Sequence, residues 1–113
     1  MSILEELNNI ISAQNIPVET GVFSNKPPVT YVVLTPISDT FELFADNKPT
    51  FDICEVRLSV FSQKNYLKIV SGIVSALLDA DFTITLRKYI SREDDTGYHQ
   101  YAIDVAKEYR LEE

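Results

Sequence analysis

The stretch TYVVLTPISDTFELFADNKPTFDICEVRLSVFSQKNY, residues 30–66, decides the fold. Its first part, Thr30–Thr35, is short and dense in β-branched and aromatic residues, which is typical of a central strand covered on both faces. Pro36 is expected to end this strand, because proline offers no N–H to a neighbouring strand. Residues 51–62 alternate between apolar and polar side chains and predict a second strand with one face toward the core. Glu55 and Arg57 lie on the opposite face, where solvent is favoured over a polar contact with another subunit.

The segment between these two strands is predicted to be a polar loop, yet it carries Phe41, Leu43 and Phe44. A loop has no periodic face that would place three large hydrophobic side chains in its own core. A soluble monomer gains nothing by leaving them in water. We therefore predict that this loop docks on another protein.

The spacing of apolar residues elsewhere predicts two helices and further strands. Helical spacing covers residues 3–14 and 64–80, and the first helix is expected to stop near Asn15. Extended segments are predicted at 18–23, 82–90 and 98–109, the last two as a hairpin. The order α-β-β-β-α-β-β indicates an α+β fold, in which two helices pack on one face of a mostly antiparallel, mixed sheet of four to five strands.

Length and local composition add two expectations. A chain of 113 residues is expected to form one domain, residues 1–113, with a radius of gyration of about 13 Å. Gly72 lies inside the second predicted helix, where glycine costs about 0.5 to 1 kcal/mol relative to alanine. A close approach by another backbone would explain its presence.

The charge balance excludes one large class of partner. Ten Lys and Arg stand against seventeen Asp and Glu, for a net charge of −7, and the basic residues form no stripe. Such a surface repels a phosphate backbone, so sequence-specific nucleic-acid binding is not expected. No stretch approaches the ~18 apolar residues of a membrane span, and the first residues lack the pattern of a leader, so folding in a cytoplasm is expected.

The residues that could carry chemistry are few, and we predict no catalytic, cofactor or metal site. His99 is the only histidine and has no evident partner, which favours a surface or interface role over catalysis. Asp94 and Asp95 follow Glu93 but lack calcium-loop spacing, so a solvated hairpin tip is favoured. Cys54 is expected to be a small buried hydrophobe.

Several short motifs occur in an order that resembles a known group of proteins. They are Ile16-Pro17, Pro27-Pro28, Tyr31-Val32-Val33-Leu34, Ser38-Asp39, Phe44-Ala45-Asp46-Asn47-Lys48 and Val56-Arg57-Leu58-Ser59-Val60-Phe61-Ser62. In this order the chain resembles small tail-completion (tail terminator) or head-tail joining proteins from phages and prophages of Gram-positive bacteria. The likeness spans the chain, including the second helix and the acidic hairpin near the C-terminus.

The resemblance implies a structural protein of the virion that needs no cofactor. It implies a ring, expected to be a hexamer, on the head-proximal end of the tail tube, made in the bacterial host cytoplasm before assembly. The ring would bind the major tail tube protein and the head-tail connector protein. An acidic lumen would let the genome pass without adhering.

The candidate interface residues lie in two segments. The first comprises Phe41, Leu43, Phe44, Asp46 and Asn47, for contact with a neighbouring subunit or the tube. The second is the hairpin tip, with Arg92, Asp94, Asp95 and Tyr98.

Three alternatives remain open from sequence. Another head-tail connector or minor virion component would share the same features. A small host enzyme or ligand-binding module would need a concave pocket with polar groups around His99 or Tyr101. A regulatory protein of anti-repressor type would need a defined partner helix.

Overall fold

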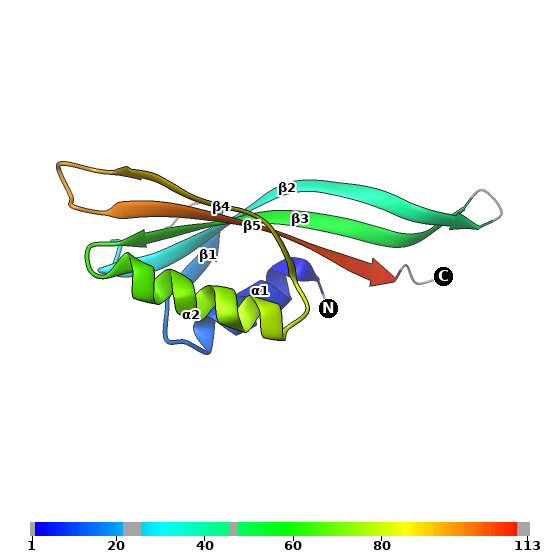
Figure 1. Cartoon of the computed structure of the whole chain (residues 1–113), viewed down its shortest axis with the longest axis horizontal. Helices are drawn as coiled ribbons and strands as arrows, with labels where there is room; N and C mark the ends of the chain where they lie inside the picture. Colours follow the sequence, from blue (N-terminus) through cyan, green and yellow to red (C-terminus); the bar gives the residue numbers. More distant parts are fainter. Residues whose placement is uncertain (1, 22–25, 46–47, 111–113) are drawn as a thin grey trace.

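The structure, a computed structural model, describes residues 2–21, 26–45 and 48–110, with the side chains of 42–50 outside that description. The elements in chain order are α1 (Ile3–Ser12), β1 (Val18–Thr20), β2 (Thr30–Ala45), β3 (Lys48–Ser62), α2 (Tyr66–Asp79), β4 (Thr83–Arg92) and β5 (His99–Arg110). The strands form one sheet in the order β1-β2-β3-β5-β4. Strand β1 is parallel to β2, and all other pairs are antiparallel. Both helices lie on the same face of the sheet (Figure 1), which confirms the predicted α+β fold and its element order.

Both helices begin and end close to the predicted positions. In α1 the Ser2 hydroxyl accepts a hydrogen bond from the Glu5 N–H at 3.2 Å, which caps the helix. Asn15 has a φ of 61°, a left-handed conformation that asparagine tolerates and that ends the helical path. In α2 the Asn65 side chain accepts from the Lys68 N–H at 3.3 Å. Neither helix of the described chain is long and apolar enough to cross a membrane.

The environment of Gly72 in α2 differs from the expectation. A Cβ at this position would lie 3.2 Å from Oε1 of Gln14, and the Gln14 amide donates a hydrogen bond to the Gly72 carbonyl at 3.4 Å. The close neighbour is therefore the end of a flexible side chain and not another backbone.

The prediction of a loop between residues 36 and 50 was wrong. Strand β2 continues through Pro36 to Ala45, and β3 begins at Lys48, so the two strands form one long hairpin. The pairing of β2 with β3 shifts register between Pro36 and Ser38, which marks a bulge. Among the described residues, β1 pairs with β2 only as far as Leu34, so no described strand lies on the outer side of β2 at Pro36. Proline is tolerated at edge positions and bulges because no neighbouring strand needs its missing N–H.

The core lies between the helices and one face of the sheet. It is built from buried apolar side chains of both helices, of β2, β3 and β5, and of the residue before β4: Ile3, Leu7, Ile11, Val32, Leu34, Cys54, Val56, Leu58, Val60, Val70, Ile73, Leu77, Phe82, Ile103 and Val105. Val18 of β1 and Ile84 of β4 are partly buried and pack against it. Tyr31 and Val33 alternate with Val32 and Leu34 and stay partly exposed on the other face. The predicted covering of this strand on both faces was therefore wrong, because both helices lie on one side (Figure 1).

The molecule is longer than a compact chain of this size. Its extents are 55 × 25 × 24 Å and its radius of gyration is 15.3 Å, against about 13 Å expected from length. The excess comes from the two hairpins, which reach past the helices at opposite ends of the sheet (Figure 1).

Candidate interaction surfaces

The first candidate surface is the β2–β3 arm, defined as residues 37–45 of β2 and 48–55 of β3. It extends beyond the end of β1 and past the helical layer (Figure 1). Phe41 lies on the arm opposite Asp52, and 59% of its surface is exposed. Ile37, at the bulge, is 46% exposed. The described part of the arm therefore presents two large apolar side chains to solvent, and the docking of this segment on a partner stays a prediction.

The structure describes less of the other contact residues that were predicted in this segment. Leu43 and Phe44 belong to β2, but their side chains lie outside the described part of the structure. Asp46 and Asn47 lie outside the described residues altogether. Among the contact residues predicted in this segment, the structure therefore gives the exposure of Phe41.

The second candidate surface is the turn between β4 and β5. Arg92, Asp94 and Asp95 are exposed there, and the Arg92–Asp94 ion pair at 3.5 Å leaves the Asp94 side chain 97% exposed. Gly97 has a φ of 78°, which lets its N–H return to the Glu93 carbonyl at 2.8 Å. The turn is held by its own hydrogen bonds and presents mainly charged groups.

Tyr98 was predicted to be part of this second surface, but it is only 8% exposed. Its hydroxyl donates to the Pro28 carbonyl at 2.5 Å, and its ring meets the Tyr31 ring edge-on at 5.5 Å. Because these contacts are within its own chain, Tyr98 anchors the turn to the residues before β2. Little of it is left for a partner.

The two candidate surfaces lie at opposite ends of the long axis (Figure 1). Since that axis measures 55 Å, one small partner cannot contact both surfaces on the same copy. Any assembly that uses both must place different neighbours at the two ends.

The open face of the sheet carries a polar centre that the sequence did not predict. Nε and Nη2 of Arg57 donate to the two carboxylate oxygens of Asp104 at 2.7 and 2.9 Å. The hydrogen bond to Asp104 and its charge raise the pKa of Arg57. Arg57 therefore contacts its own chain, where solvent had been expected. Farther along β2 and β3, Tyr31 stacks on Phe61 at 4.7 Å and lines a shallow cavity of about 370 Å³.

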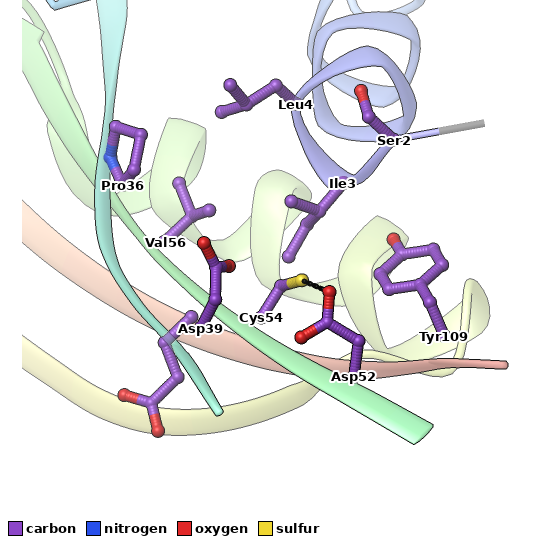
Figure 2. Close-up of a pocket in the computed structure, with 10 residues that line it drawn as sticks. Ser2, Ile3, Leu4, Pro36, Asp39, Asp52, Cys54, Val56 and Tyr109 are labelled. Atoms are coloured by element: carbon purple, nitrogen blue, oxygen red, sulfur yellow. Dashed lines mark hydrogen bonds between the residues drawn. The ribbon is translucent and has the colours of Figure 1, made fainter. Parts of the chain in front are cut away.

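A second cavity, also about 370 Å³, lies where α1 meets the base of the β2–β3 arm (Figure 2). The Cys54 thiol points to Asp52 and donates to its Oδ2 at 3.6 Å. Burial and hydrogen bonding to Asp39 raise the pKa of Cys54 to about 12. Cys54 is 9% exposed, which confirms the predicted buried cysteine.

Asp39, Asp52 and Cys54 bring three possible ligand atoms within 4.8 Å of one another. The sequence did not predict this cluster, because the three residues meet only through the pairing of β2 with β3. Exposed acidic groups often lie this close together without an ion, and Asp39 is exposed. We assign no metal to the cluster.

His99 lies among aromatic side chains. Its Nδ1 is 3.0 Å from the Tyr89 hydroxyl, and its ring lies 4.8 Å from the ring of Tyr66. None of three cavities found in the described part of the chain has His99 or Tyr101 in its lining. The pocket required by the enzyme or ligand-binding alternative is therefore not among these cavities.

An ion-pair network fixes α1 against the sheet at the base of the arm. Nζ of Lys107 donates to both carboxylate oxygens of Glu6, at 3.0 and 3.2 Å, and to the Ala80 carbonyl at 2.9 Å. The Tyr109 hydroxyl also donates to Glu6. Burial alone would raise the pKa of Glu6, but hydrogen bonds from Tyr109 and Lys107 and the charge of Lys107 lower it.

The fold and these surfaces define an elongated α+β domain whose prominent features are a projecting hairpin arm and an open sheet face. No protein-family model matches the chain, and no curated protein matches it. Its fold is similar to that of a chain in the virion of a native gene transfer agent particle, with a TM-score of 0.51 and 10% sequence identity. The likeness covers 90% of this chain and 84% of that chain. At this identity the comparison shows a shared fold.

Proposed function

We propose that this chain is a structural protein of a phage or prophage virion that completes the tail. It acts by protein–protein binding, as one domain of residues 1–113. Six copies form a ring on the head-proximal end of the tail tube, where the ring stops tube growth and joins the tube to the head connector. No cofactor takes part, and DNA passes through without specific binding.

The observation that carries this proposal is the β2–β3 arm with Phe41 exposed. A large aromatic ring that is 59% exposed on a projecting hairpin costs a monomer solvation free energy, and contact with a partner would recover it. Two further observations support the proposal. The ordered motifs resemble tail-completion proteins, and the structural neighbour belongs to a virion.

The first experiment measures self-association and tube binding. Size-exclusion chromatography with light scattering is run on the chain alone and with the tail tube protein of the same virion. We expect a ring alone or on the tube. A chain that stays monomeric at high concentration and never binds the tube protein would overturn the proposal.

A matched pair of variants assigns the contact to the arm. Phe41→Ser removes an aromatic ring that is 59% exposed, and Leu67→Ser removes a side chain that is 63% exposed on α2. We expect Phe41→Ser to lose assembly and Leu67→Ser to keep it. Equal loss in both would mean that exposed apolar area in general, and not the arm, drives association.

Deletion of the gene separates the terminator role from that of another connector component. Electron microscopy of the resulting particles should show overlong tails if the chain terminates the tube. Normal tails detached from filled heads would instead indicate a head-tail joining protein, the alternative that shares this fold and these motifs.

A further inference from the structure

Two edges of the sheet are left without a neighbouring strand among the residues that the structure describes. Strand β4 is the last strand at one edge. At the other edge, β1 pairs with β2 only up to Leu34, so no described residue pairs with the outer side of β2 from Thr35 onward. An exposed strand edge carries unpaired N–H and C=O groups and is a template for pairing with another chain.

Exposed apolar side chains gather on these same two strands. On β4, Leu86, Tyr89 and Ile90 are 37%, 41% and 41% exposed, and on β2, Ile37 and Phe41 are 46% and 59% exposed. Charge, proline and bulges are the usual protection of an edge strand, but several large exposed apolar groups are not. Such apolar groups mark a surface that binds a partner.

The two strands also carry opposite charge. Strand β4, TITLRKYISR, contains Arg87, Lys88 and Arg92 and no acidic residue. Strand β2, TYVVLTPISDTFELFA, contains Asp39 and Glu42 and no basic residue. In a chain with a net charge of −7, this concentrates three of the ten basic residues on one edge. Complementary charge favours contact between unlike edges and disfavours contact between two β2 edges.

We propose that β4 of one copy pairs with the free edge of β2, residues 38–42, in a second copy, so that the sheets of neighbouring subunits become continuous. The inference rests on the proposed ring and names the surfaces that close it. Because the contact joins two different edges, it is head-to-tail and leaves both edges available for further copies. Repetition of such a contact produces a closed ring when the rotation per copy allows it.

The strand directions fit this pairing. Successive neighbours in the order β2-β3-β5-β4 are antiparallel, so β4 runs opposite to β2 within one copy. A second copy in the same orientation therefore presents its β4 antiparallel to β2. Bulges in β4 near Thr85 and Ile90 leave Leu86–Tyr89 as a regular segment, and β2 is regular from Ser38 to Glu42. These two segments are the ones that can pair.

The offset between the segments fits the geometry of a closed sheet. Lys88 of β4 pairs with Ala102 of β5, which pairs with Ser59 of β3. Thr40 of β2 pairs with Ile53 of β3, six residues away from Ser59. Six residues along β3 correspond to about 20 Å, and the four strands that repeat from copy to copy, β2, β3, β5 and β4, span about 19 Å across the sheet. A neighbour shifted by this amount gives strands tilted by about 46° to the ring axis, close to the 35 to 45° typical of closed sheets.

Disulfide cross-linking tests the pairing directly. Single-cysteine variants are made in a Cys54→Ser background and mixed in pairs, so that any cross-link joins two copies. The variants are Asp39→Cys and Thr40→Cys on β2, and Arg87→Cys, Lys88→Cys and Tyr89→Cys on β4. Opposite residues of antiparallel strands lie within disulfide reach. We expect cross-links between the two sets and none between the β2 set and Ser71→Cys on the exposed side of α2.

Charge reversal provides an independent readout. Arg87→Glu with Lys88→Glu changes the β4 edge, and Lys64→Glu with Lys68→Glu changes the net charge equally at exposed positions near α2. We expect the β4 variant to self-associate at least about tenfold more weakly than the native chain and the control to change little. Equal effects of the two variants would mean that net charge, not the β4 edge, controls association.

The outcomes separate this inference from the proposed function. A ring that forms without any β4–β2 cross-link overturns the interface and leaves the tail-completion ring standing. Cross-links without overlong tails in the gene deletion support the interface and count against the terminator role. A chain that neither associates nor cross-links overturns both.

Discussion

Arg57 and Asp104 lie 47 residues apart in the sequence and form a two-pronged ion pair on the open face of the sheet, with N–O distances of 2.7 and 2.9 Å. The Asp104 side chain is 12% exposed and that of Arg57 is 42% exposed. The pair joins β3, the central strand of the sheet, to its neighbour β5. Loss of Arg57 would therefore leave a largely buried carboxylate without its partner.

We predict that Arg57→Met lowers the free energy of unfolding by about 1 to 3 kcal/mol, because an unpaired buried acceptor costs its desolvation. The value lies toward the lower end, since solvent already screens the exposed side of Arg57. Urea denaturation measures the change, with Lys68→Met as the control at an exposed lysine. Equal stability of the two variants would show that the ion pair contributes nothing beyond a surface contact.

The Glu6 network predicts an acid dependence of stability. The pKa of Glu6 is lowered in the folded chain, so its contribution is fully present above the ordinary value of 4.5 and is lost as pH falls through the lower folded value. The stability difference between the native chain and Glu6→Gln should therefore shrink below about pH 4.5. Denaturation curves at several pH values measure this. A constant difference across that range would contradict the prediction.

Cys54 should react very slowly with alkylating reagents near neutral pH. Its pKa rises from 9.0 to about 12, which lowers the fraction of reactive thiolate about a thousandfold. Iodoacetamide labelling followed by mass spectrometry should give slow modification of the folded chain and fast modification in denaturant. Asp39→Asn should speed labelling of the folded chain, since the Asp39 carboxylate helps to raise the pKa.

Gly72→Ala should stabilise the protein by about 0.5 to 1 kcal/mol, because alanine favours the helix over the unfolded chain. The added Cβ would lie 3.2 Å from Oε1 of Gln14, but this atom ends a flexible, exposed side chain that can move. Thermal unfolding measures the gain. A loss of stability would show that the hydrogen bond from Gln14 to the Gly72 carbonyl holds the two helices together more tightly than its 3.4 Å length suggests.

Much of the fold could be predicted from local patterns. The helical spacing gave both helices, because each buries one stripe of its surface against the sheet. The turn residues before Tyr98 gave the β4–β5 hairpin. The alternation of apolar and polar residues from Cys54 to Val60 correctly predicted which side chains of β3 face the core.

The errors come from features that depend on the whole sheet. Proline ends a central strand but is tolerated in an edge strand, and no local pattern shows that the pairing of β1 with β2 ends at Leu34. The Arg57–Asp104 pair and the Asp39, Asp52 and Cys54 cluster depend on register between distant strands. Tyr98 was expected at the surface because it follows a polar turn. Its hydroxyl instead donates a hydrogen bond to the Pro28 carbonyl, in the segment before β2.

Pro36 has one consequence beyond the shape of the arm. A proline on an edge strand has no proton to donate to an incoming strand. If a neighbour adds to β2, its hydrogen-bonded ladder can grow toward Ala45 but is interrupted at Pro36, next to the bulge. Pro36 would then determine where the hydrogen bonds between two neighbouring subunits begin on β2. It would in this way fix the spacing of copies around the circle.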